Sequence, residues 1–85
     1  MKVLKYLENY YKMELNDTKE VIEGVRLGIV RWITIDELIN GALGRIMGAA
    51  LFAQSFDEDY EEVTYEAIED LYKKYKKQIE ELKNE

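Results

Sequence analysis

The chain has 85 residues, of which 47% are hydrophobic and 35% are charged, and its formal net charge is −6. This composition is too hydrophobic for a disordered segment and too charged for a membrane protein, and the length suits one small domain over residues 1–85. Cysteine and histidine are both absent, which excludes disulfides, thiol nucleophiles and thiolate metal sites, and removes the usual general base and the commonest transition-metal ligand.

The spacing of apolar residues predicts helices through most of the chain, because they recur three and four positions apart and proline is absent. A first helix is predicted over about residues 2–13, and the polar stretch 15–18 is expected to interrupt it. Asp17, with Glu20 three residues later, has the pattern of an N-cap and its reciprocal partner. A short second helix is therefore predicted over about 18–28, ending at a glycine.

Residues 29–33 are apolar and largely β-branched, but no second strand is available to pair with them. We therefore expect a tight connector whose side chains, including Trp32, fill the core. The alternative is that Arg31 and Trp32 lie on an exposed turn and anchor a contact with another molecule.

Thr34 and Glu37 have the spacing of a capping box, which predicts the start of a third helix over about 35–54. Apolar residues occur on nearly every side of this helix, a pattern typical of a helix enclosed by others.

A fourth helix is predicted over about 64–83, with Thr64 as its N-cap. Its apolar residues follow a heptad pattern; they are Tyr65, Ile68, Tyr72, Tyr75, Ile79 and Leu82. The sequence therefore predicts an all-α protein, a small four-helix bundle, with dimerisation left open.

Eight acidic residues and no basic residue lie between positions 57 and 70; they are Asp57, Glu58, Asp59, Glu61, Glu62, Glu66, Glu69 and Asp70. This acidic cluster is interpreted either as the solvated start of a helix or as a docking surface for a basic partner. The run does not match a calcium-binding loop, because Glu62 and Ile68 occupy the positions of the required glycine and glutamate.

Gly41, Gly44 and Gly48 share one face of the third predicted helix, where each glycine costs about 1 kcal/mol relative to alanine. Close approach of another helix explains this cost, and that helix is either the last helix of the same chain or the same helix of a second subunit. Arg45, between them, must reach solvent or a carboxylate, with Glu37 and the acidic cluster as candidate partners. An exposed Arg45 would instead indicate an interface.

Tyr72 and Tyr75 are expected to pack in the core, although such an aromatic seam also suits an interface. We therefore expect a small non-enzymatic protein-interaction or adaptor module that self-associates through the glycine face or the tyrosine seam. The alternative is an acidic inhibitor, of the kind that phages and mobile elements carry, which docks its carboxylates on a basic or nucleic-acid-binding site of a target protein.

The remaining expectations concern location and ligands. No secretory signal pattern opens the chain, which favours the cytoplasm, and we expect no cofactor, no metal and no membrane partner. Direct nucleic-acid binding is not expected either, because nearby glutamates offset the four lysines within residues 73–77.

Overall fold

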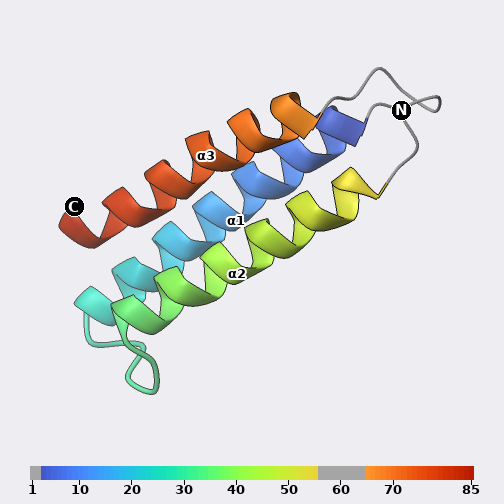
Figure 1. Cartoon of the computed structure of the whole chain (residues 1–85). Helices are drawn as coiled ribbons and strands as arrows, with labels where there is room; N and C mark the ends of the chain where they lie inside the picture. Colours follow the sequence, from blue (N-terminus) through green and yellow to red (C-terminus); the bar gives the residue numbers. More distant parts are fainter. Residues whose placement is uncertain (1–2, 56–64) are drawn as a thin grey trace.

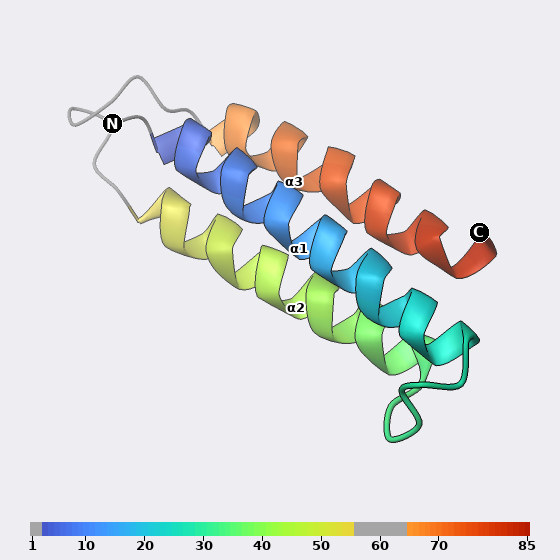
Figure 2. The same ribbon diagram turned by 180° about the vertical axis from the view of Figure 1, so that it is seen from behind.

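The computed structural model describes residues 3–55 and 65–85, and this part of the chain is helical without strands. It contains α1 (Val3–Arg26), α2 (Ile35–Gln54), α3 (Tyr65–Glu81) and a short 3-10 turn η1 (Leu82–Asn84). The three helices lie side by side in an elongated bundle, with α2 running antiparallel to α1 and α3 (Figure 1). The connector between α1 and α2 and the C-terminus therefore lie at the same end, as the reverse view also shows (Figure 2). The all-α prediction is confirmed.

The predicted count of four helices is wrong, because 3–13 and 18–26, most of the first two predicted helices, belong to one continuous helix, α1. The predicted interruption contains neither glycine nor proline, and its residues each cost a helix only about 0.7 kcal/mol or less. Asp17 is exposed within α1 and is not an N-cap. Glu14 and Thr18 are buried and continue the inward-facing row of Tyr11 and Ile22, so packing against the other helices offsets the weak local propensity.

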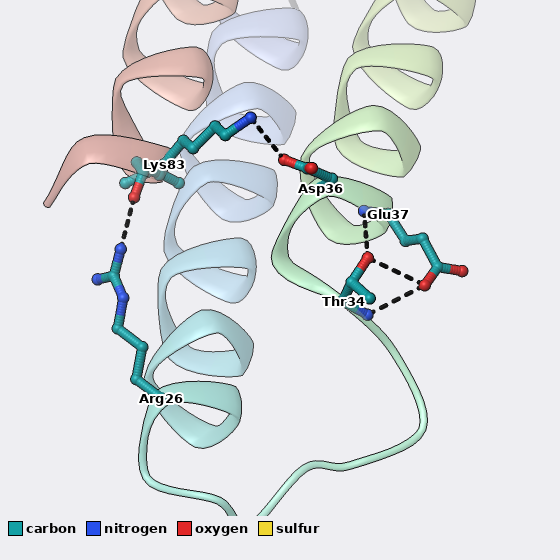
Figure 3. Close-up of polar contacts among 6 residues, drawn as sticks. Arg26, Thr34, Asp36, Glu37 and Lys83 are labelled. Carbon is teal, nitrogen blue, oxygen red and sulfur yellow. Dashed lines mark hydrogen bonds and ion pairs between the residues drawn. The ribbon is translucent and has the colours of Figure 1, made fainter.

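Local capping interactions set the start of α2 and the end of α1. The predicted capping box is confirmed, since the Glu37 backbone N–H donates to the Thr34 hydroxyl oxygen at 3.1 Å and the Thr34 N–H donates to the Glu37 carboxylate at 3.1 Å (Figure 3). At the end of α1, Gly28 has φ of +77°, a left-handed conformation that glycine adopts without strain. The Ile29 N–H donates to the Gly24 carbonyl at 2.9 Å and closes the helix in a Schellman motif.

The core runs along the whole bundle and receives residues from all three helices. Its buried apolar members are Leu7, Tyr11, Ile22, Ile39, Ala42, Ile46, Ala50, Ala53, Ile68, Tyr75, Ile79 and Leu82. The Tyr11 ring contacts the Tyr75 ring with 5.5 Å between centroids, and the Tyr11 hydroxyl donates to the Ile46 carbonyl at 2.8 Å. Tyr11 therefore joins α1 to both other helices.

Two burial predictions are wrong. α2 is not enclosed: Met47 and Leu51 are 51% and 62% exposed, because a bundle of three helices has no fourth helix to cover this side. The connector does not fill the core either, since Trp32 is 80% exposed. The described residues include no helix that is both long enough and apolar enough to cross a membrane.

Candidate functional site

The most unusual surface of the bundle is one side of α2, which we call the open face and define by Gly44, Met47, Gly48 and Leu51. All four residues are exposed. Apart from the adjacent residues and the backbone of α2 itself, no atom of the described residues lies within 4 Å of the position that a Cβ would take at Gly44 or Gly48. The predicted packing of these two glycines against the last helix of the same chain is therefore wrong.

The open face carries almost no charge, because Arg45 is the single charged residue between Leu38 and Ser55 in a chain where 35% of residues are charged. Soluble proteins tolerate scattered exposed apolar side chains, but a contiguous group on an uncharged helix face is typical of an interaction site. The open face is therefore the strongest candidate for an interface among the described residues.

Arg45 lies at the edge of the open face and is paired within the chain. Its Nε donates to the Glu14 carboxylate at 2.8 Å, and the Tyr10 hydroxyl donates to the same carboxylate oxygen at 3.1 Å. The hydrogen bond to Glu14 is the main reason that the pKa of Arg45 is raised. The partner of Arg45 is thus Glu14 on α1 and not Glu37, which belongs to the capping box.

Gly41 has a different role from the other two glycines. A Cβ at this position would come within 3.3 Å of an Arg45 guanidinium nitrogen. The missing side chain therefore leaves space for Arg45 to reach across α2 toward Glu14. Of the three predicted interface glycines, Gly44 and Gly48 alone are open.

Beside the open face, α1 and α2 form an apolar groove with a volume of about 450 Å³. Its described lining residues carry no charge; they are Val3, Tyr6, Leu7, Tyr10, Ala49, Phe52 and Ala53. Tyr6 and Phe52 remain 57% and 66% exposed at its rim. No local sequence pattern indicated this groove, because its lining residues come from two helices.

The connector presents a second exposed apolar group at the other end of α2. Ile29 is 74% exposed and Trp32 is 80% exposed, so Trp32 occupies the turn that the sequence analysis gave as the alternative. The Arg31 Nε donates to the Gly28 carbonyl at 2.9 Å, which ties the connector to the end of α1. Ile29 was expected to fill the core with the rest of the connector, and its exposure contradicts that prediction.

Two polar contacts fix this end of the bundle. Arg26 donates to the Leu82 carbonyl at 3.0 Å, and Lys83 forms an ion pair with Asp36 at 3.0 Å (Figure 3). They join the end of α1 and the start of α2 to η1. The connector is therefore held between elements whose relative positions are set.

The other predicted site residues lie elsewhere. Tyr75 is buried in the core and Tyr72 is half-buried beside it, so the tyrosine seam serves the fold of the chain itself. Residues 57–62 of the acidic cluster, and Thr64, lie outside the described residues. Glu66, Glu69 and Asp70 are exposed on α3, and Glu69 pairs with Lys73, four residues later, at 3.0 Å.

Within the described ranges, no group of three or more acidic side chains is arranged to hold a metal ion. The comparisons give no independent guide to function: no protein-family model, no curated protein and no solved structure matches this chain. The open face, the groove and the connector are therefore the features of this chain that can indicate its function.

Proposed function

We propose that this chain is a small non-enzymatic protein-interaction module of the cytoplasm that forms a homodimer through the open face of α2. The observation that carries the proposal is that Gly44 and Gly48 lie on the same uncharged side of α2 as the exposed Met47 and Leu51. Each glycine costs about 1 kcal/mol relative to alanine in a helix. No described contact within the chain offsets that cost for Gly44 or Gly48.

A second helix packed on this face would offset the cost. Glycine lets two helix backbones approach closely, and the flanking Met47 and Leu51 would then lose their exposure to water. Burial of exposed apolar area contributes about 25 cal/mol per Å², so two copies of such a face gain more than the glycines cost.

The charge distribution restricts self-association to the open face. The chain carries a net charge of −6, which disfavours contact between two copies over most of the surface. The open face is the exception, since Arg45 at its edge is neutralised by Glu14. A closed dimer uses the same patch on both copies, and an uncharged patch meets itself without repulsion.

The experiment measures the solution mass by light scattering, at low and high salt, for the native chain and two variants. Gly48→Gln places a long side chain on the open face while raising helix propensity, so the fold is retained. Asn16→Gln puts the same side chain on the exposed side of α1 as a control. We expect a dimer at both salt concentrations for the native chain and for Asn16→Gln, and a helical monomer for Gly48→Gln.

Two results would overturn the proposal. One is a monomeric native chain at every protein and salt concentration, after which the acidic-inhibitor hypothesis becomes the next to test. The other is a Gly48→Gln variant that stays dimeric, because the dimer would then use another surface.

A further inference from the structure

Trp32 is the single tryptophan of the chain and, at 80%, its indole is more exposed than any other large hydrophobic side chain that the structure describes. The connector that carries it is held by the Schellman motif at Gly28 and by the Arg31 hydrogen bond. Trp32 is thus presented on a fixed turn, so its burial by a partner would cost little conformational entropy.

The groove between α1 and α2 has the chemistry to receive such a side chain. Its described lining is uncharged, and its volume of about 450 Å³ lies in the range of pockets that bind small apolar groups. Tyr6 and Tyr10 of α1 line one wall, and the small residues Ala49 and Ala53 of α2 line the other. Aromatic rings in such a setting stack or pack edge to face with an inserted indole.

Trp32 cannot reach the groove of its own chain. Ala53 lies 21 positions further along, so at 1.5 Å per residue the two are separated by about 30 Å along α2. The connector and the first turn of α1 lie at opposite ends of the bundle (Figure 2).

An antiparallel dimer removes this separation. With a two-fold axis beside Gly44, Ala53 of one copy lies opposite Ile35 of the other, because each is nine positions from the axis. Trp32 precedes Ile35 by three residues, so the connector of one copy extends over the groove of the other. A parallel pair would instead bring the two connectors together and leave both grooves uncovered.

The area that two α2 faces can bury also supports this contact, because it is too small for a stable interface without it. The α2 face is about 30 Å long and about 10 Å wide, so two copies bury on the order of 600 Å². A stable interface needs about 1,200–2,000 Å². Each inserted tryptophan buries about 150–250 Å² of its own surface and a similar area of groove, so two insertions add about 600–1,000 Å² and complete the interface.

We propose that the groove of each copy receives the partner subunit's Trp32 in an antiparallel dimer, an inference that rests on the homodimer proposed above. The partner is a second copy rather than a lipid surface, because the net charge of −6 opposes binding to anionic lipid. The proposal makes the α1–α2 connector a specificity element for self-recognition.

Tryptophan fluorescence tests the inference, because Trp32 is the single tryptophan of the chain and its emission therefore reports on this site alone. Emission and light-scattering mass are measured on the same samples across a protein dilution series. We expect the emission to shift to shorter wavelength as the mass doubles. A doubling of mass without a shift would overturn the insertion and leave the dimer standing, whereas a constant monomer mass would overturn both proposals.

Variants give a second readout. Trp32→Ala and the groove-filling Ala49→Phe should each weaken the dimer about tenfold or more, as expected for an aromatic hot spot and its pocket. Leu27→Ala, a change at another exposed connector residue, is the control and should leave the dimer unchanged. Equal dimer affinity in all three variants would contradict the insertion, as would a shift that needs added phosphatidylserine vesicles.

Discussion

Replacing Tyr11 with phenylalanine should make the free energy of unfolding depend on pH in a defined way. Tyr11 is fully buried, and its hydroxyl donates to the Ile46 carbonyl at 2.8 Å. Burial, with smaller contributions from Tyr72 and Tyr10, raises its pKa from the ordinary 10.0 to about 12. The folded chain therefore holds this proton more tightly than the unfolded chain does.

The sign and size of the effect follow from linkage. A raised pKa in the folded state stabilises the fold at pH values below 10, and this contribution is lost as the pH rises from 10 through 12. A difference of 2 pKa units corresponds to about 2–3 kcal/mol. At pH 7, Tyr11→Phe should cost about 1 kcal/mol for the lost hydrogen bond, since the Ile46 carbonyl keeps its bond within the helix.

The plots of unfolding free energy against pH for the native chain and for Tyr11→Phe should therefore cross. Urea unfolding, followed by circular dichroism at one protein concentration, should show the native chain more stable at pH 7 and Tyr11→Phe more stable by about 1 kcal/mol near pH 12. Other titrating groups are common to both proteins and cancel in the difference. Tyr65→Phe, at a ring that is 61% exposed, is the control and should show no crossing. A stability difference for Tyr11→Phe that stays constant from pH 9 to 12 would refute the reasoning.

Two further changes test the local structure of α1, both measured by urea unfolding. Gly28→Ala should destabilise the fold by about 1 kcal/mol, because φ of +77° is unfavourable for any residue with a Cβ; an unchanged stability would mean that the helix does not end in this conformation. Asp17→Ala should keep or raise stability by up to about 0.5 kcal/mol if α1 is continuous, whereas a loss of about 1 kcal/mol would show that Asp17 caps a separate helix.

The features that the sequence predicted correctly are those determined by neighbouring residues. The capping box of Thr34 and Glu37 joins groups three residues apart, and α2 begins where this local signal places it. The heptad seam of α3 likewise depends on spacing within one helix. Ile68, Tyr75 and Ile79 are buried as the spacing indicates, whereas Tyr65 in the first turn is 61% exposed. Such signals involve few residues and little competition from the rest of the fold.

The errors concern positions whose environment depends on distant residues. The neighbours of Glu14 in the sequence suggest a surface position, but a hydrogen bond from Arg45, 31 residues away, makes the burial of its carboxylate tolerable. The break in α1 was predicted from the stretch 15–18 and from the spacing of Asp17 and Glu20, but packing of Glu14 and Thr18 against the other helices keeps the helix continuous. The missing fourth helix then changed the environment of α2, because a face that four helices would enclose is exposed in a bundle of three.

The candidate site was predictable in part. The glycines of α2 and Trp32 were selected from the sequence, but their exposure depends on how the three helices pack. The groove joins Tyr6 and Tyr10 to Ala49 and Ala53 on another helix, so no local pattern could reveal it. Its lining follows from the pairing of α1 with α2.

The central claim is that the open face of α2 joins two copies of this chain. The most direct test is the light-scattering mass of the native chain beside Gly48→Gln, over a range of protein concentrations at high salt, where surface charge interactions are screened. The account predicts a native dimer and a folded Gly48→Gln monomer. A native monomer throughout, or a dimer that Gly48→Gln leaves intact, would contradict it.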